Sequence, residues 1–509
     1  MPEAKFANLS IEDKAAQLIM IDIPDQELGG KSAQHLSAHA WNGIILFAKN
    51  VKDRHQVNKL IKDIHKNAKV APFMAVDQEG GLVDRFRYPE MSLSPGAMAL
   101  GVTDSEANVY EAHRIMGEEL RDLGIHIDFA PCLDVNNNPR NPIIGVRSFS
   151  ADPHKAATFG CAAIRGLRDG GVIPTAKHFP GHGNTDTDSH LALPSIKGTR
   201  QQLEETELVP FKAAIKEKVE AIMTAHIVFP ALDAKLPATL SKTILTELLR
   251  QELGYEGVIV TDSLSMKSIA NTWGFGEATV MSIEAGADLV LALGSFEQQL
   301  QSLEALIEAV KSGRISEERL DESLARLEKL RLNHQGLPQE EIAHTEEHRA
   351  IMSQIVAQTA EVLRDRNNLL PLRLAEGAKV AVVSPDLLPQ SPLGEVSQSL
   401  NLAPLLAKYG IEAQEFKFNM ASFGPPLNQL VRDLQGFDYV ILALYARGQL
   451  SDSQKELARE IPQVCANTVI LPLSSPYFLE DMAWIDTAVT AYNYSLASLE
   501  AALAKIFAR

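Results

Sequence analysis

The segment Lys177–His190 holds the densest set of residues that could do chemistry. Its sequence, KHFPGHGNTDTDSH, contains His178, His182 and His190, and it places Asp188 two residues before the last of them. A carboxylate beside an imidazole fixes the imidazole tautomer and raises its pKa toward the working range of an acid–base catalyst. The segment therefore predicts proton transfer, with a histidine metal site or a histidine bonded only to backbone as alternatives.

A single aspartate ends a second apolar run. Asp262 follows Val258–Thr261 and precedes Ser263 and Leu264. A charged group at the end of a buried strand is costly unless it is partnered, which makes Asp262 a candidate for a functional carboxylate. The same side chain could instead cap the helix that follows.

Two further stretches offer groups that could hold sugar hydroxyls. Asp77 begins the run DQEGG, and Arg85 follows it within ten residues. Arg147 lies in the run GVRSFS. The pair Gly80-Gly81 permits a tight backbone turn directly after Asp77. Carboxylate and guanidinium groups in such positions are suited to binding a polar ligand by hydrogen bonds.

The elements that would position these groups alternate regularly along the chain. Strands are predicted at Leu18–Ile23, Gly43–Phe47, Pro72–Asp77, Ile125–Val135, Val172–His178, Ala221–Val228, Gly257–Leu264 and Leu289–Gly294. Helices are predicted at Lys59–Ala68, Ser105–Leu123, His154–Arg168, Gln201–Lys218 and Ser241–Leu253. Eight buried strands separated by helices predict a (β/α)₈ TIM-type barrel, with an open doubly wound sheet as the alternative.

Polar residues end most of these strands: Asp22, Asp77, Asp134, Lys177, His178, His226 and Asp262. A barrel collects the carboxyl ends of its strands on one rim, where active sites are built. We therefore expect these side chains to gather there.

A second, smaller α/β domain is predicted beyond the barrel. Helical patterns at Ser316–Leu332 and Glu346–Arg364 lead into a turn-like break at Asn367–Pro371. Strand patterns then follow at Val380–Ser384, Tyr439–Leu444, Val469–Leu473 and Ala488–Tyr492. The predicted organisation is a catalytic barrel over residues 1–340, a helical linker over 341–370 and a smaller sandwich-like domain of about four strands over 371–509.

Composition excludes several classes of partner. The 509 residues carry a formal net charge of −17, which would repel nucleic acid. No apolar run approaches the ~18 residues of a membrane span. Three widely spaced cysteines suit a reducing compartment, and Met1–Ser10 lacks the apolar run of a signal peptide. A cytoplasmic protein is expected, or a secreted one if a signal peptide has been removed; the oligomeric state is not indicated.

Together these segments resemble glycoside hydrolase family 3, in its bacterial β-N-acetylglucosaminidase branch. The resemblance covers roughly Leu9 to Leu332 and rests on the Lys177–His190 loop, on TDSL ending the seventh strand and on DQEGG after the third. It implies Asp262 as nucleophile and His190 as general acid/base assisted by Asp188. It also implies sugar binding by Asp77, Arg85, Arg147, Lys177 and His178. Leu82 departs from the family pattern, in which an arginine is common.

The implied activity is a retaining β-N-acetylhexosaminidase without cofactor or metal. Asp262 would form a glycosyl ester while His190 protonates the leaving oxygen, and His190 would then activate water. The expected partner is a saccharide with terminal N-acetylglucosamine, from peptidoglycan turnover or from chitin oligomers.

Three other functions stay open at this stage. Phosphorolysis on the same scaffold would replace water by phosphate. A metal-dependent barrel hydrolase would use His178, His182 and His190. A non-catalytic sugar-binding protein would keep Asp77 and the arginines but would need neither Asp262 nor Asp188.

Overall fold

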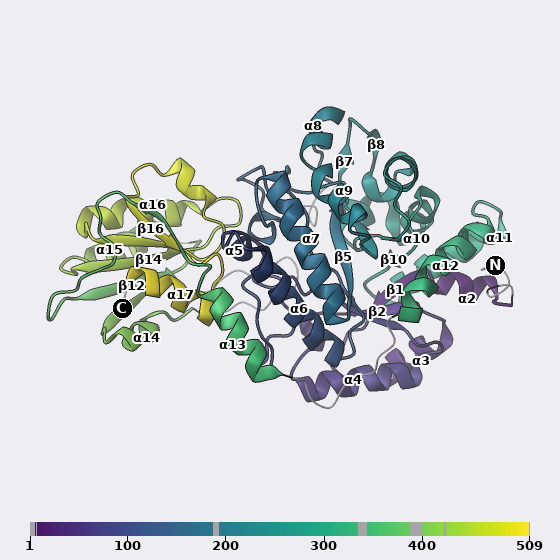
Figure 1. Cartoon of the computed structure of the whole chain (residues 1–509), viewed down its shortest axis with the longest axis horizontal. Coiled ribbons are helices and arrows are strands. Elements are labelled where there is room, and N and C mark those ends of the chain that lie inside the picture. Colours follow the sequence, from purple (N-terminus) through teal and green to yellow (C-terminus); the bar gives the residue numbers. More distant parts are fainter. Residues whose placement is uncertain are drawn as a thin grey trace.

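The chain forms two α/β units, one built on an eight-stranded sheet and the other on a six-stranded sheet (Figure 1). The computed structural model describes Phe6 and residues 8–186, 193–333, 344–386, 400–421 and 424–507. In this part of the chain, no helix combines the length and the apolar character needed to cross a membrane.

All eight predicted barrel strands are present. They are β1 (Ile19–Asp22), β2 (Gly43–Leu46), β3 (Phe73–Val76), β4 (Ile127–Asp128), β5 (Ile173–Phe179), β6 (Ala221–Thr224), β9 (Val258–Val260) and β10 (Val290–Leu291). They pair in parallel in the order β10-β1-β2-β3-β4-β5-β6-β9. A bridge between Val260 and Leu289 joins the two ends of this order. The predicted (β/α)₈ barrel is therefore confirmed.

Helices surround the barrel on its outside (Figure 1). They are α2 (Ile11–Ala16), α3 (Gly30–Ala38), α4 (Arg54–Asn67), α5 (Ala97–Gly101), α6 (Glu106–Asp122), α7 (Pro153–Gly170), α8 (Arg200–Glu205), α9 (Leu208–Lys216), α10 (Lys267–Ala285), α11 (Phe296–Lys311) and α12 (Glu317–Asn333). Local sequence explains several starts: Ser105 caps α6, and Asp152 caps α7 ahead of Pro153. A two-stranded ribbon, β7 (Val228–Phe229) and β8 (Asp233–Pro237), follows β6.

Two helical predictions need correction. The stretch Gln201–Lys218 is not one helix but α8 and α9, because Pro210 has no N–H to donate to the carbonyl of Thr206, where the helix breaks. The stretch predicted as Ser241–Leu253 is a π-helix over Thr243–Glu252. We find no sequence signal for a π-helix rather than an α-helix at this position.

The C-terminal unit has six strands where about four were predicted. They are β11 (Glu361–Asp365), β12 (Val380–Pro385), β13 (Ala413–Phe418), β14 (Tyr439–Leu444), β15 (Thr468–Pro472) and β16 (Thr487–Thr490), in the order β11-β16-β15-β14-β12-β13. The accompanying helices are α13 (Thr345–Val356), α14 (Ala403–Leu406), α15 (Pro425–Asp433), α16 (Asp452–Val464) and α17 (Leu496–Ile506).

The predicted helix Glu346–Arg364 is wrong in its second half. Helix α13 ends at Val356, and residues 361–365 form β11, which pairs antiparallel with β16. The partner strand lies more than 100 residues away, so no local pattern could show it. Strand β13 was missed for a related reason: it is an edge strand with few buried positions, and its apolar pattern is weak.

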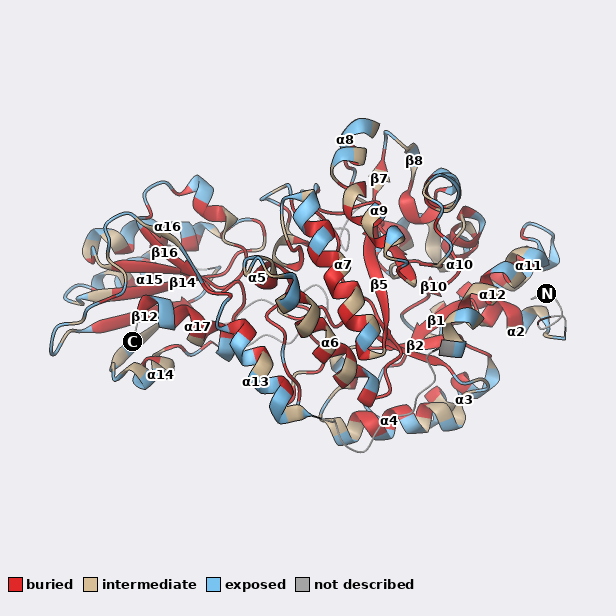
Figure 2. Ribbon diagram, viewed as in Figure 1, coloured by how far each residue is buried: buried red, intermediate tan, exposed pale blue. Residues whose placement is uncertain are grey.

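A continuous apolar core joins the two units. Leu100 of α5, Ile115 of α6 and Phe159 of α7 belong to the same buried cluster as Met352 of α13 and Leu503 of α17. The barrel strands and the inner strands of the C-terminal sheet are buried, and the outer faces of the helices are exposed (Figure 2). The shared core holds the C-terminal unit against the α5–α7 side of the barrel, next to the rim on which the polar strand ends meet.

Candidate active site

A pocket opens at the carboxyl ends of the barrel strands. It is lined by Asp77, Glu79, Val83, Ile143, Arg147, Lys177, His178, His182, Met223 and Asp262, and we call it the rim pocket. Its empty volume is about 390 Å³. Its residues come from β5 and β6 and from the segments after β3, β4, β5 and β9. The parallel arrangement brings these distant segments together, as expected for a barrel.

Four charged side chains form a buried network on one side of the rim pocket. The Lys177 Nζ lies 2.8 Å from Asp77 Oδ1 and 2.6 Å from Glu79 Oε1. Arg147 donates to both Glu79 carboxylate oxygens, at 2.8 and 2.7 Å. Fork-to-fork pairing of this kind fixes the planes of both groups. The network presents oriented cations and carboxylates to the pocket.

The charges in this network support one another. Burial alone would raise the pKa of Glu79, but the Arg147 and Lys177 charges outweigh it and hold the pKa well below its ordinary value. Burial would lower the pKa of Lys177, but Asp77 and Glu79 hold it above its ordinary value. Glu79 is therefore a carboxylate and Lys177 an ammonium at neutral pH.

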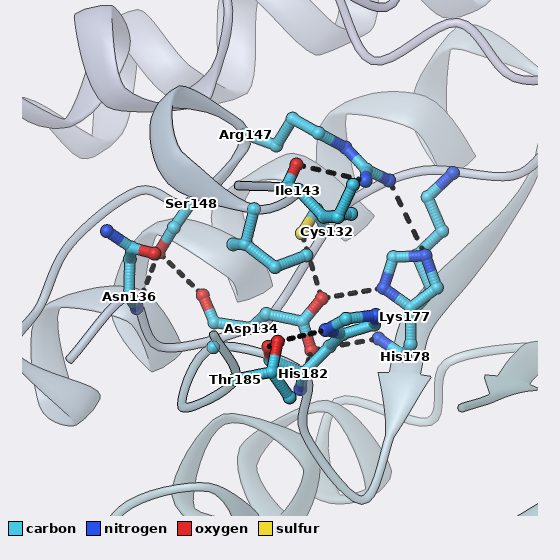
Figure 3. A network of polar contacts seen from close by, with 12 residues as sticks. Cys132, Asp134, Asn136, Ile143, Arg147, Ser148, Lys177, His178, His182 and Thr185 are labelled. Carbon is cyan, nitrogen blue, oxygen red and sulfur yellow. Dashed lines mark hydrogen bonds and ion pairs between the residues drawn. The ribbon is translucent and has the colours of Figure 1, made fainter. Parts of the chain in front are cut away.

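Asp134 is the centre of a second polar network, which includes His178 and His182 of the pocket lining (Figure 3). Its Oδ2 accepts from His178 Nδ1 at 2.6 Å and from Cys132 Sγ at 3.2 Å. Its Oδ1 accepts from the backbone N–H groups of His178 and His182 at 3.2 and 2.7 Å. Burial acts to raise the pKa of Asp134, but the neighbouring His178 outweighs it and lowers the pKa to about 2. Asp134 thus stays ionised and fixes the backbone and ring of His178.

This arrangement selects the tautomer of His178. Because Nδ1 lies against the Asp134 carboxylate, it carries the proton. The other ring nitrogen, Nε2, lies 3.4 Å from Arg147 Nη2, which can only donate. Nε2 is therefore held as an acceptor beside the pocket. For His182, burial lowers the pKa to about 4, so this ring is neutral at neutral pH.

Cys132, Asp134 and His178 are also close enough to be considered as metal ligands, with ligand atoms within 4.8 Å of one another. Asp134 already accepts hydrogen bonds from four donors. A carboxylate offers about four lone-pair sites, so these donors occupy it fully. The three residues fit an internal hydrogen-bond network better than a metal centre.

Asp262 faces the rim pocket from the end of β9. It is half-buried, and its Oδ1 accepts from the backbone N–H of Ser263 at 2.7 Å. The carbonyl of Ser263 in turn lies 2.9 Å from His226 Nε2, and His226 Nδ1 lies 2.7 Å from Thr239 Oγ1. The strand-end histidine thus supports the Asp262 turn from outside the pocket.

The structure brings most of the predicted site residues together. Asp77, Arg147, Lys177, His178 and Asp262 all line the rim pocket. Arg85 is not among these lining residues: its Nη2 lies 3.9 Å from Asp77 Oδ2, and its guanidinium lies over the ring of Phe47, so its role in sugar binding stays a prediction. Asp188 and His190 lie outside the described residues, so their roles remain predictions.

Two carboxylates of the site were given no role in the sequence analysis. Glu79 lies two residues beyond Asp77, and Asp134 was noted as a polar residue at the end of a strand. The position of Asp134 at the end of a strand could have indicated a role in the site, because the other polar strand ends, at Asp77, Lys177 and Asp262, reach the pocket. Nothing local indicated that Glu79 pairs with Arg147, 68 residues later.

Residues 10–330 match the family described as Glycosyl hydrolase family 3 N terminal domain. This is more than half of the chain. The chain belongs to glycosyl hydrolase family 3. The predicted resemblance is confirmed, and the matched residues are those that form the barrel.

Similar proteins include a Beta-hexosaminidase A of Pseudoalteromonas piscicida, 36% identical over 390 residues, which are 69% of this chain and 64% of that protein. A Beta-hexosaminidase of Idiomarina loihiensis is 33% identical over 332 residues, 64% of this chain and 96% of that protein. A solved family 3 β-N-acetylglucosaminidase from Paenibacillus sp. str. FPU-7 superposes with a TM-score of 0.91 at 34% identity, covering 98% of this chain and 97% of that one. The last likeness extends over both units.

Proposed function

We propose that this family 3 chain is a retaining β-N-acetylhexosaminidase that removes terminal β-linked N-acetylglucosamine. The observation that carries the proposal is the rim pocket itself. It places a half-buried carboxylate, Asp262, in the same small pocket as the Lys177 ammonium and the His178 imidazole. The two relatives described above are named β-hexosaminidase, and the similar solved structure is a β-N-acetylglucosaminidase.

In the proposed reaction Asp262 attacks the anomeric carbon and the glycosidic bond breaks. His190 donates its proton to the leaving oxygen, and Asp188 stabilises the imidazolium. The resulting glycosyl–Asp262 ester is then hydrolysed by a water molecule from which His190 takes a proton. The retained configuration follows from two successive displacements at the same carbon.

The charged network would hold the sugar during both steps. Lys177 and Arg147 present donors to hydroxyl groups, and Asp77 presents an acceptor. Because each of these groups is already fixed by an ion pair, little ordering remains to be done on binding.

The proposal is tested by following hydrolysis of an aryl β-N-acetylglucosaminide by NMR, with and without phosphate. We expect N-acetylglucosamine released first as the β anomer, at a rate independent of phosphate. Release first of the α anomer would contradict the glycosyl-ester mechanism. Formation of N-acetylglucosamine 1-phosphate would assign the chain as a phosphorylase.

A further inference from the structure

A buried asparagine joins two loops of the barrel rim. Asn141 lies in the segment between β4 and α7, which also carries Arg147 and which we call the β4–α7 loop, and it is 2% exposed. The other loop follows β5 and leads from His182 toward Asp188 and His190. Asn141 is not among the residues that line the rim pocket. Any effect of Asn141 on the reaction therefore passes through the residues that it holds.

The amide nitrogen of Asn141 donates to the loop after β5. Nδ2 lies 2.9 Å from the His182 carbonyl oxygen, 2.8 Å from the Gly183 carbonyl oxygen and 3.3 Å from Thr185 Oγ1. Thr185 Oγ1 in turn lies 3.2 Å from His182 Nδ1. We call residues 182–185 the stem, because Asp188 and His190 follow directly after it, three and five residues beyond Thr185.

The amide oxygen of Asn141 holds its own loop. Oδ1 accepts from the backbone N–H groups of Ile143 and Ile144, both at 2.9 Å. Ile143 lines the rim pocket, and its carbonyl oxygen lies 3.5 Å from Arg147 Nη1. An amide offers two N–H donors and two lone pairs on its oxygen, and all of them are engaged here. This single side chain therefore links the β4–α7 loop to the stem.

Backbone contact brings the same two loops close together. A Cβ added to Gly183 of the stem would lie 1.6 Å from the carbonyl oxygen of Val135 in the β4–α7 loop. Only glycine allows such an approach. Asn138 of the β4–α7 loop donates from Nδ2 to the Thr185 carbonyl at 3.2 Å. The stem thus has its position set by the β4–α7 loop along its whole length.

The C-terminal unit contacts the other side of the β4–α7 loop. Gly448, which follows β14, has φ +75°, and a Cβ added there would lie 2.6 Å from the Arg140 carbonyl oxygen and 3.4 Å from the carbonyl carbon of Asn141. The C-terminal unit therefore lies directly against the backbone of the residue whose side chain holds the stem.

We propose that Asn141 is a positioning residue for general acid/base catalysis, whose amide sets the distance between the stem, which leads to His190, and the sugar held by the β4–α7 loop. This inference rests on the proposed function, in which His190 is the proton donor. A proton donor must lie within hydrogen-bond distance of the leaving oxygen. A displacement of about 1 Å can cost about 10²-fold in rate. Loss of the Asn141 donors should therefore harm proton transfer more than sugar binding.

The experiment compares two substrates with the same terminal sugar. The β-1,4-linked disaccharide of N-acetylglucosamine has a leaving group that needs a proton, whereas the dinitrophenyl β-N-acetylglucosaminide has one that departs as a stable anion. We call kcat/KM on the disaccharide, divided by kcat/KM on the aryl glycoside, the leaving-group ratio. Because sugar binding is common to both substrates, the ratio isolates proton donation.

Asn141→Asp separates the two halves of the amide. The new side chain keeps an acceptor for Ile143 and Ile144, but it places an oxygen instead of the NH₂ group against the carbonyls of His182 and Gly183. We expect the leaving-group ratio to fall by about 10–100-fold. The kcat/KM on the aryl glycoside should change little.

Asn50 supplies a matched control. It is fully buried, its Nδ2 donates to the carbonyls of Ile23 and Asp25, and its Oδ1 accepts from the Phe47 N–H. It thus joins the loops after β1 and β2 in the way that Asn141 joins the loops after β4 and β5. Asn50→Asp should lower stability in urea unfolding about as much as Asn141→Asp, and it should leave the leaving-group ratio unchanged.

A second pair of variants tests the loop from the C-terminal side. Gly448→Ala places a methyl group against the Arg140 carbonyl and should lower the leaving-group ratio by a smaller factor than Asn141→Asp. Gly436 of the same unit has φ +91°, and a Cβ added there meets no atom within 4 Å. Gly436→Ala therefore introduces similar backbone strain without the contact and should leave the ratio unchanged. This pair decides if Asn141→Asp does not fold.

The outcomes for the two proposals are separable. Equal losses on both substrates in Asn141→Asp, or an equal fall of the ratio in Asn50→Asp, would overturn the positioning role and leave the proposed function standing. An unchanged ratio in Gly448→Ala would remove the C-terminal contact from the assignment, and it would overturn the positioning role if Asn141→Asp does not fold. Failure of the wild type to hydrolyse either substrate would instead refute the proposed function.

Discussion

The rim pocket adjoins a second pocket between the barrel and the C-terminal unit, and the two are built differently. In the rim pocket, Glu79 is paired with Lys177 and Arg147, and Asp134 is saturated by four donors. The second pocket is lined by segments of both units, and its Ser475 Oγ has no hydrogen-bond partner among the described residues. The first is therefore organised by the barrel alone, whereas the second exists only where both units meet.

The largest effect is expected from Asp262→Asn. Removal of the nucleophile abolishes the covalent step while the fold is kept, because Asp262 is only half-buried, so turnover should fall by several orders of magnitude. A slow fluorinated glycoside incubated with the wild type should leave added mass on the peptide that contains Asp262. Mass found on a peptide with another carboxylate would show that the nucleophile lies elsewhere.

His190→Ala should cost about 10²–10⁴-fold on sugar leaving groups, the usual contribution of general acid catalysis. The loss should be much smaller for the first step with an activated aryl glycoside, whose leaving group departs as a stable anion. With the activated aryl glycoside, the His190→Ala variant should show a burst and a lowered KM. Azide should restore its turnover and form a β-glycosyl azide. Asp188→Asn should cause the same changes to a smaller extent. An equal loss on both leaving groups, without rescue, would make His190 a binding residue.

Glu79→Gln should destabilise the barrel by about 3–5 kcal/mol, because it leaves the buried Arg147 and Lys177 without their shared carboxylate. The folded pKa of Glu79 is depressed, so this stability is present above the unfolded pKa and is lost as pH falls. The difference from wild type in urea unfolding should thus shrink below about pH 4.3.

Asp63→Asn provides the control for Glu79→Gln. It breaks the exposed Lys59–Asp63 pair on α4, a pair of the kind worth less than about 1 kcal/mol. Similar losses for the two variants would mean that the rim network contributes no more than a surface pair.

A smaller effect is expected at the junction of the two units. His348 of α13 lies 3.0 Å from Glu118 and 3.3 Å from the fully buried Glu119 of α6. The hydrogen bond and charge of Glu119, with Glu118, raise the pKa of His348 against the opposing effects of burial and Arg114. The contribution of His348 to the free energy of unfolding is therefore fully present below the unfolded pKa of about 6.5. It is lost as pH rises through the folded pKa.

His348→Gln should accordingly cost about 1.5–3 kcal/mol at pH 5.5, the value of a hydrogen bond to a charged group, and less at pH 9. Urea unfolding of both proteins at the two pH values measures this difference. A cost that does not depend on pH would mean that His348 acts through packing alone.

Removal of metal should have the least effect. Since Asp134 is saturated by hydrogen bonds to Cys132, His178 and His182, activity should survive dialysis against a strong chelator. Loss of activity on chelation, with recovery on adding zinc, would favour a metal-dependent hydrolase over the glycosyl-ester mechanism.

The sequence predicted much of the barrel site because its signals are local. Apolar runs mark all eight strands, and parallel strands place their polar ends on one rim, which brings Asp77, Lys177, His178 and Asp262 to one pocket. Arg85 was assigned to the sugar by resemblance; its Nη2 lies 3.9 Å from Asp77 Oδ2, and its role in sugar binding stays a prediction.

The sequence by itself determined the set of helices and strands and the barrel rim on which the polar side chains lie. Short segments are enough for this, because the apolar pattern of a strand and the polar residue at its end are local features. Only the tertiary structure decided the ion pair of Glu79 with Arg147, the antiparallel pairing of β11 with β16 and the close approach of Gly448 to the Arg140 carbonyl. These contacts join residues 68 to more than 300 positions apart, and their energies depend on packing and burial that no local pattern encodes.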